Sequence, residues 1–399
     1  MTAVGATLTA LGMVATIGVV AAAATPQTAP ATAALRYLYS QVGSDGSVAG
    51  SMGATEDTVI SVADNGYDPA TLTNASSGAS AYDYLSAHAS TITTAGGAAK
   101  YVLAWLAAGR PHAIDGTALL ARLNSPTAAG GYLEPNGAFH NADSTVETAN
   151  AFSQSLAVLA DVAARHVLPA NATGWLTCAQ RADGGFGYAI HDTAAIPPVS
   201  CGDTSSDSND TAIVLEALGA AGVTSADGAG ASYLHGVQQP DGGFGFAAAG
   251  PSDPGSDAGA IQALVAIGQD PTGAAWTRSG GGDPMANLEA FADPKGSGGY
   301  VFPGKASPDA FTTSAVPQAL ALKPYGAATN IAAGTAPAPA TPTPAPTPSP
   351  AAQGSAGITV PSTGASGGPG GTAIPLLLIG LGALLVGASR RARRRAAAR

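Results

Sequence analysis

Apolar residues recur every three to four positions in many short segments of this chain, and glycine-rich turns separate the segments. The clearest unit covers residues 174–222. In it, an apolar segment around Trp175 leads into the turn Asp-Gly-Gly-Phe (183–186), and a second apolar segment follows at 210–218. A period near 3.6 residues is typical of a helix. The pattern therefore predicts a helix, a turn, a polar loop and a second helix.

This two-helix unit occurs six times between Ala33 and Tyr325. Its first helices are expected near Leu35, Tyr82, Leu119, Trp175, Tyr233 and Leu288, and its second helices near Thr55, Ala98, Ser144, Asp210, Asp257 and Thr312. The turns are expected at 45–48, 96–97, 130–132, 183–188, 241–246 and 298–302. Helical repeats of this size bury a core only when they stack. The sequence therefore predicts an all-α fold of about twelve helices.

Polar residues mark the expected starts of several second helices. Asp210 and Asp257 are predicted as N-caps, because an aspartate side chain accepts hydrogen bonds from free N–H groups of the first turn. The tetrad Ser-Thr-Val-Glu (144–147) predicts a capping box. Pro317 falls early enough in the sixth inner helix to be tolerated there.

The turn motif resembles that of a known superfamily. Gln180 and Gln238 each stand three residues before an Asp-Gly-Gly-Phe turn, as in the QW-type repeats of squalene cyclases and protein prenyltransferases. More broadly, the repeats resemble the α/α-toroid superfamily, which includes the cobalamin-binding domain of intrinsic factor and transcobalamin. The resemblance implies an α6/α6 toroid over 33–326, with six inner helices inside six outer ones. Phe186 and Phe244 stand where the family usually has Trp.

Class II terpene cyclases, which share this fold, protonate an alkene with an Asp-x-Asp-Asp motif, whose central acid must be neutral. The nearest match is Asp-Ser-Asn-Asp (207–210), in which Asn209 replaces the central acid. An asparagine cannot donate a catalytic proton. Asp207 and Asp210 are therefore weak catalytic candidates, and helix capping is the favoured role for Asp210.

The two cysteines match no catalytic or metal motif of the superfamily. Prenyltransferases hold zinc with an Asp-x-Cys pair, and complement-type toroids carry a Cys-Gly-Glu-Gln thioester. Neither Cys178 nor Cys201 fits these patterns. An even number of cysteines in a chain with secretion signals predicts a disulfide between them. Asp203, Asp207 and Asp210 lack the spacing of a calcium loop, so neither a metal nor a cofactor is expected.

Four residues that follow the turns are candidates for ligand binding. Tyr188, Phe246 and Phe302 leave the turns toward the loop side, where they would line a cavity mouth, and His191 follows one of the same turns. Packing between helices is the alternative role for the aromatic side chains. The expected partner is a small molecule or surface ligand whose identity the residues do not reveal.

The N-terminal segment and the charge point to a secreted protein with no nucleic-acid partner. Residues 1–25 are signal-like, because an apolar stretch ends in three alanines at 22–24, as at an Ala-x-Ala cleavage site. The formal net charge is −10, although six arginines lie in the last ten residues. The rest of the chain is more acidic still, which disfavours binding to nucleic acid.

The C-terminal region predicts a stalk and an anchor. Residues 327–359 alternate proline with small residues, which is typical of an extended linker. The segment 360–399 begins with a sequence that resembles the Leu-Pro-x-Thr-Gly sorting signal of Gram-positive surface proteins, formed by Val360, Pro361, Ser362, Thr363 and Gly364. The resemblance implies that a sortase cleaves after Thr363 and joins the chain to the cell wall.

An apolar segment at 374–388 and the arginine cluster follow this motif. Fifteen residues are short for a permanent membrane span, and the arginines fix a cytoplasmic end. A simple C-terminal membrane anchor is the alternative to sortase attachment.

These expectations place the toroid outside the cell, on a stalk. Such a location suits a non-catalytic module that binds a ligand, with cobalamin as one candidate by analogy, or an adhesive module. The alternative is a divergent class II terpene-cyclase-like enzyme. Any of these functions would reside in sites grafted on the fold.

Overall fold

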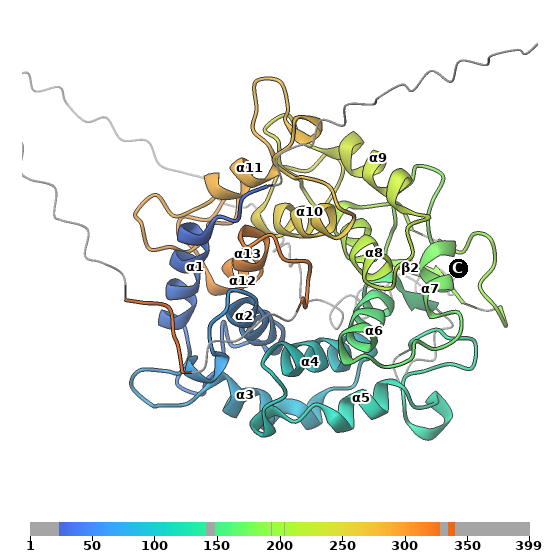
Figure 1. Cartoon of the computed structure of the whole chain (residues 1–399), viewed down its shortest axis with the longest axis horizontal. Coiled ribbons are helices and arrows are strands. Elements are labelled where there is room, and N and C mark those ends of the chain that lie inside the picture. Colours follow the sequence, from blue (N-terminus) through green and yellow to red (C-terminus); the bar gives the residue numbers. More distant parts are fainter. Residues whose placement is uncertain (1–23, 141–147, 193, 203, 328–333, 340–399) are drawn as a thin grey trace, which may run out of the picture.

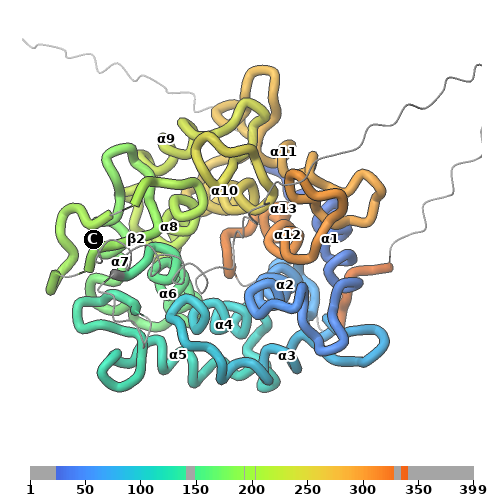
Figure 2. Tube along the Cα trace, turned by 180° about the vertical axis from the view of Figure 1, so that it is seen from behind, coloured from blue at the N-terminus to red at the C-terminus, as the bar shows by residue number. Residues whose placement is uncertain are grey.

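The computed structural model describes residues 24–140, 148–192, 194–202, 204–327 and 334–339. Its helices form two concentric rings (Figures 1 and 2). The outer ring contains α1 (Thr28–Ser40), α3 (Ala81–His88), α5 (Thr117–Leu123), α7 (Ala172–Cys178), α9 (Asp227–Val237) and α11 (Pro284–Ala290). The inner ring contains α2 (Met52–Asp64), α4 (Ala95–Ala107), α6 (Ala151–Ala164), α8 (Ser208–Ala220), α10 (Pro254–Ala266), α12 (Ala310–Ser314) and α13 (Val316–Leu320). The mostly helical toroid predicted from the sequence is confirmed.

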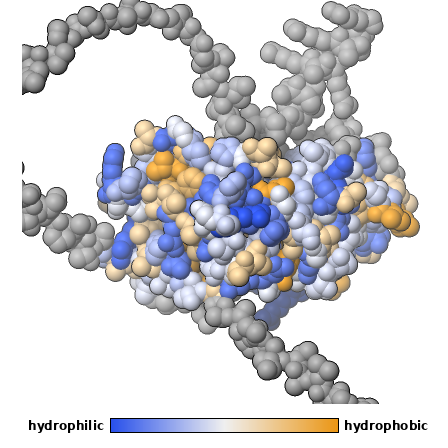
Figure 3. Space-filling model, turned by 90° about the horizontal axis from the view of Figure 1, so that it is seen from above, coloured by the Kyte–Doolittle hydropathy of each residue, from blue (hydrophilic) through white to orange (hydrophobic). Residues whose placement is uncertain are grey.

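The inner ring is closed. Its helices contact one another in chain order, and α12 and α13 return to contact α2. Inner helices are buried on all sides, and in α2 every residue from Ala54 to Asp64 is buried. The outer helices cover this ring and turn polar residues to solvent. On the side of the toroid in Figure 3, hydrophobic areas are small and scattered among hydrophilic ones.

Glycines in the turns let one repeat lie against the next. Gly242 has φ +94°, and a methyl group there would lie 2.1 Å from the carbonyl oxygen of Gly282, just before α11. Gly298 has φ +85° and approaches the carbonyl oxygen of Ala33 in α1 in the same way. A side chain is disfavoured at both positions by the backbone conformation and by the lack of space. The contact of Gly298 with α1 joins the last repeat to the first.

The glutamine of the motif also joins neighbouring repeats. Gln238 Nε2 donates to the carbonyl oxygens of Gly242, in its own turn, and Trp276, in the next repeat, both at 2.7 Å. Gln180 makes the equivalent bonds to Gly184 and Ala226 at 3.0 and 3.1 Å. The motif residues are therefore accounted for by structure.

A second polar position, four residues after the N-cap of the inner helix, holds the turn in five of the six repeats. Its side chain accepts a hydrogen bond from the backbone N–H of an apolar turn residue. The pairs are Val48 with Thr55, Phe139 with Gln154, Phe186 with Thr211, Phe244 with Asp257 and Tyr300 with Thr313. These N–H groups are buried, so a missing acceptor would leave each without a partner.

The structure corrects the predicted N-caps. Asp207 caps α8, because its side chain accepts a hydrogen bond from the N–H of Asp210 at 2.8 Å. Asp253 caps α10 in the same way. The predicted caps, Asp210 and Asp257, therefore lie inside the first turn. Because the loops before these helices contain several cap-forming residues, composition alone did not fix the register.

The third repeat also differs from its prediction. Its helix α6 begins at Ala151 and is capped by Asn150, so the helix starts later than 144–147, the predicted capping box, which lies outside the described residues. The turn equivalent to Asp-Gly-Gly-Phe is Asn-Gly-Ala-Phe at 136–139, where Gly137 has φ +89° and Phe139 is buried. The expected turn at 130–132 precedes it.

Smaller differences concern breaks in the helical pattern. Gly96 and Gly97, expected in a turn, lie inside α4. Pro317 follows a break at Ala315 and lies in the first turn of α13, because proline has no N–H to continue α12. One short antiparallel sheet, β1 (Thr148–Asn150) with β2 (Ala189–His191), connects the third and fourth repeats.

The targeting signals fall mostly outside the described residues. This holds for residues 1–23 of the signal-like segment, for the sorting motif 360–364 and for the apolar segment 374–388. Within the described ranges, no helix combines the length and apolar character needed to cross a bilayer.

Candidate binding site at the centre of the toroid

The inner helices enclose a small cavity at the centre of the ring. Its wall contains polar residues from four inner helices, Asp57, Lys100, Asn209, Glu216 and Gln262, together with apolar and small residues and Tyr325. The space open to the centres of water molecules is about 60 Å³. One water needs roughly 10–15 Å³ on this measure. The cavity therefore has room for a few water molecules beside Tyr325.

A buried ion pair crosses from α2 to α4 at this cavity. Lys100 Nζ lies 2.8 Å from Asp57 Oδ2, and the two side chains are only 8% and 4% exposed. Removing one partner of such a pair would leave an uncompensated buried charge. The two residues are therefore a fixed unit of the wall.

After α13 the chain runs into the middle of the ring (Figure 1), and Tyr325 of this segment lines the cavity. The hydroxyl of Tyr325 donates to Oδ1 of Asp57 at 2.7 Å, and the backbone N–H of Tyr325 donates to Oε2 of Glu216. Asp57 thus receives hydrogen bonds from Lys100 and Tyr325, one on each carboxylate oxygen. Tyr325 connects α2 with α8 across the ring.

Two glutamates of the inner ring titrate far from their usual range. Burial raises the pKa of Glu216 to about 8, although the N–H of Tyr325 lowers it in part. Burial also raises the pKa of Glu56 to about 8, with Lys100 lowering it and Asp57 raising it. Both carboxyl groups are therefore largely neutral at pH 7.

The two aspartates of the motif at the start of α8 do not line this cavity. Asn209 is the motif residue in the wall, whereas Asp207, which is half-buried, and Asp210, which is buried, lie beside the turn that carries Phe186 and Tyr188. Burial raises the pKa of Asp210 well above its usual range, and the neighbouring Asp207 raises it further. Burial also raises the pKa of Asp207. Two adjacent carboxyl groups with raised pKa values share a proton readily.

The ligand-binding candidates from the sequence are dispersed. Tyr188 and Phe302 are half-buried, His191 is exposed in β2, and Phe246 is 38% exposed. None of these four contributes to the wall of the central cavity. Their binding role stays a prediction.

Sequence reasoning missed the residues of the central site. A signal was present, because Lys100 interrupts the apolar segment 98–106, and Asp57 and Glu216 interrupt two other inner helices. A charge on the apolar stripe of a helix indicates a buried pair or a site. Tyr325 carried no comparable signal, since it follows the last repeat.

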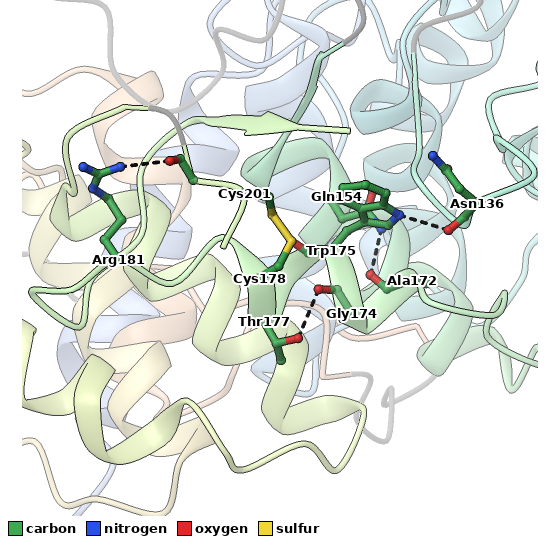
Figure 4. The surroundings of a disulfide bond; sticks show 10 residues. Asn136, Gln154, Ala172, Gly174, Trp175, Thr177, Cys178, Arg181 and Cys201 are labelled. Carbon is green, nitrogen blue, oxygen red and sulfur yellow. Dashed lines mark hydrogen bonds between the residues drawn. A yellow bond between two sulfur atoms is a disulfide. The ribbon is translucent and has the colours of Figure 1, made fainter. Parts of the chain in front are cut away.

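The predicted disulfide is present (Figure 4), and neither of its cysteines lines the central cavity. Cys178 and Cys201 are bonded, with their Cα atoms 5.2 Å apart. Beside them, Trp175 Nε1 donates to the carbonyl oxygen of Asn136 at 3.0 Å, and Gln154 Nε2 donates to that of Ala172 at 2.9 Å. The disulfide lies within the fourth repeat, and these two hydrogen bonds join that repeat to the third.

Among the described residues, no group of three or more His, Cys, Asp or Glu side chains is arranged to hold a metal ion. His140 Nε2 contacts Asp192 Oδ2 near β2, as an isolated pair. Asp203, one member of the acidic loop considered above, lies outside the described residues.

Comparison with known proteins gives similarity in fold alone. No family model matches the chain, and no curated protein matches it by sequence. Similar solved structures include ent-copalyl diphosphate synthase from Streptomyces platensis, at 18% identity and a TM-score of 0.44, covering 68% of this chain and 50% of that one. The chain thus spans half the length of that synthase.

Two further solved structures match this chain over almost their whole length. The type II terpene cyclase MstE from Scytonema is 13% identical with a TM-score of 0.49, covering 74% of this chain and 98% of that one. A protein from Actinoplanes is 14% identical with a TM-score of 0.45, covering 74% and 99%.

Proposed function

We propose that this protein is a secreted, surface-anchored module that binds a ligand at the centre of its toroid without catalysis. One observation carries the proposal. The wall of the central cavity presents a fixed set of polar groups, with the Asp57–Lys100 pair on one side and Glu216 on the other. Concave sites with a few convergent polar groups are the usual places for small ligands.

The size of the cavity bears on what can bind. With Tyr325 in place, the open space admits only a small group, so a ligand as large as cobalamin would have to bind elsewhere or after rearrangement. An adhesive role would use the outer surface. The face in Figure 3 offers no broad hydrophobic area for it. Binding at the centre is therefore the favoured form of the proposal.

A divergent cyclase is the second candidate, and one observation favours it. Protonation of an alkene requires a neutral carboxyl group, and Glu216 is such a group in the cavity wall. Against this candidate, Asn209 replaces the motif acid and Asp210 does not line the cavity.

Incubation with squalene and with geranylgeranyl diphosphate separates the two candidates. The binding proposal expects no cyclic product from the wild type. Product that disappears in Glu216→Gln or Asp210→Asn would establish the enzyme instead. A thermal-shift screen of small polar and aromatic compounds tests the binding proposal directly, with Asp57→Asn as the control that should lose any shift.

The extracellular location belongs to the same proposal. The signal-like N-terminus and the sorting motif support it, and so does the disulfide, because such bonds persist mainly in oxidising compartments. The described linker residues 334–339 lie on the outside of the ring. Here the N–H of Asp68 donates to the carbonyl oxygen of Thr335 at 3.0 Å, and the N–H of Gly334 donates to Asp68 Oδ2 at 3.2 Å.

A further inference from the structure

The segment that fills the centre of the toroid is not needed to close the ring. Ring closure is complete by Leu320, whose carbonyl oxygen accepts a 2.7 Å hydrogen bond from the N–H of Gln27. The inner ring closes through α12 and α13 against α2, and all three helices precede Tyr325. Tyr325 therefore enters a cavity that the helices have already formed.

The path of this segment bends sharply into the cavity. Leu322 has φ +54°, which is unfavourable for a residue with a side chain, and Gly326 has φ +70°. Gln262 Nε2 holds the segment by donating to the carbonyl oxygen of Lys323 at 3.2 Å. Gly326 packs closely against Leu103 of α4. A strained path that is held by contacts at several points indicates a specific position for Tyr325.

The contacts of Tyr325 are those of a ligand in a polar site. Its phenol donates to a carboxylate that is already paired with Lys100, and its amide N–H donates to Glu216 on the opposite wall. The ring of Tyr325 lies between these two ends. A free molecule with a phenolic hydroxyl and a neighbouring N–H would satisfy the same groups.

We propose that Tyr325 is a built-in occupant of the ligand site, and that the external ligand is a phenol with a neighbouring N–H donor that takes its place. This inference rests on the proposed binding function and names its ligand class. Because the linker begins shortly after Tyr325, the occupant is carried by the same segment that leads to the stalk. Access to the site is thus controlled by withdrawal of this segment.

The test removes the occupant and supplies it again as a free molecule. p-Cresol, toluene and N-acetyltyrosinamide are titrated calorimetrically into the secreted wild type and Tyr325→Ala. The matched control is Tyr39→Ala, which removes a tyrosine of α1 whose hydroxyl lies 2.7 Å from Thr71 Oγ1, outside the inner ring. We expect p-cresol to bind Tyr325→Ala at least tenfold more tightly than either the wild type or the control.

The polar ends of the site are tested in the same titrations. We expect toluene, which lacks the hydroxyl, to bind Tyr325→Ala about tenfold more weakly than p-cresol, since an unmet buried acceptor disfavours the analogue. N-acetyltyrosinamide should bind more tightly than p-cresol. Equal binding of p-cresol and toluene, or equal binding of p-cresol to Tyr325→Ala and Tyr39→Ala, would overturn the inference.

A second variant covers the case in which Tyr325→Ala does not fold. Tyr325→Phe keeps the ring and loses the hydrogen bond to Asp57. Free p-cresol should therefore displace the side chain at position 325 at a lower p-cresol concentration in this variant than in the wild type. Unchanged competition would overturn the inference. If a ligand of another class binds the wild type but Tyr325→Ala gains no phenol binding, only this inference fails. If Tyr325→Ala gains phenol binding while the wild type binds nothing, Tyr325 is a permanent part of the site, and the proposed function fails together with the displacement of Tyr325 by an external ligand.

Discussion

The backbone N–H of Phe244 donates a 2.6 Å hydrogen bond to Oδ1 of Asp257, which lies one turn inside the next inner helix. The carboxyl group of Asp257 is buried, and burial raises its pKa well above the usual range. In four other repeats the same position holds Thr or Gln, whereas in α4 it holds Ala98. The position is thus defined by one requirement, an acceptor for the N–H of the turn.

Loss of the acceptor at this position should destabilise the toroid, and Thr211 occupies the position in the fourth repeat. In Thr211→Val the shape is kept but the N–H of Phe186, bonded at 2.9 Å to Thr211 Oγ1, loses its partner. We expect the free energy of unfolding to fall by about 1–3 kcal/mol, the usual cost of a buried unsatisfied group. Chemical denaturation measures it. Thr211→Ser keeps the hydroxyl and should cost clearly less; equal losses would refute this role.

The turn aromatic itself should contribute through burial. Phe244 is fully buried, and its ring centre lies 6.4 Å from that of Trp276 in the next repeat. Phe244→Ala should lower the free energy of unfolding by about 3–5 kcal/mol. Phe246, in the same turn and 38% exposed, is the matched control and should cost much less as Phe246→Ala. Similar melting temperatures for the two variants would contradict the expectation.

The stability of the protein should fall as pH rises from about 4.5 to about 8. The pKa of Glu216 is about 8 in the folded state, against an ordinary value of 4.5. Between these values the folded state keeps a proton that the unfolded state has lost. The contribution of this proton is complete below pH 4.5 and disappears as pH passes the folded value, by at most about 1.4 kcal/mol per pH unit.

Glu216→Gln should reduce this slope, because an amide does not ionise while its oxygen still accepts the N–H of Tyr325. Denaturation midpoints at several pH values measure the effect. The variant and the wild type should agree near pH 4, where both side chains are neutral. A slope unchanged by the substitution would show that Glu216 keeps an ordinary pKa.

The disulfide should stabilise the outer part of the fourth repeat. We expect the double variant Cys178→Ser, Cys201→Ser to lose about 3 kcal/mol of unfolding free energy, the scale for a loop of this length. Peptide mapping without reductant should show the two cysteines linked. A reductant should have no further effect on the double variant. Two thiols that are readily alkylated in native protein would contradict the bond.

The sorting motif makes a prediction about the whole chain. Thr363→Ala should prevent cleavage by a sortase and shift the protein from the cell wall to the membrane fraction or the medium. Cell fractionation with an antibody to the toroid measures this distribution. If a strain without sortases distributes the protein as the wild type does, Val360 has made the motif inactive and the apolar segment 374–388 is the anchor.

The sequence revealed the ring because its signals are local. The Gln and Asp-Gly-Gly-Phe positions of the fourth and fifth repeats make contacts within their own turn or to the next repeat, so their spacing is regular. The third turn was misplaced because Asn136 and Ala138 replace two residues of the motif. The caps were misplaced because Asp207 and Asp210 are both good caps and the choice depends on packing.

The central site could not be predicted because its parts are distant in sequence. Asp57, Glu216 and Tyr325 meet only after the ring has closed. The periodic pattern of apolar residues contains no information about contacts between residues so far apart in the sequence. The sequence did show Lys100 within an apolar helix. A buried lysine requires a charged partner, but the sequence does not indicate which residue that is.

The contact between Gly298 and α1 has a consequence for how the protein is made. A linear repeat array can fold from its first units onward, because each unit needs only its neighbours. Here α1 needs the last repeat, including the carbonyl group of Leu320, which the ribosome synthesises much later. Closure is therefore a pairing between distant parts of the chain, and such pairings are slow to form. Until then α1 lacks its contacts with α12 and α13, so a nascent chain released before residue 320 should be a substrate for chaperones and proteases rather than a shorter stable toroid.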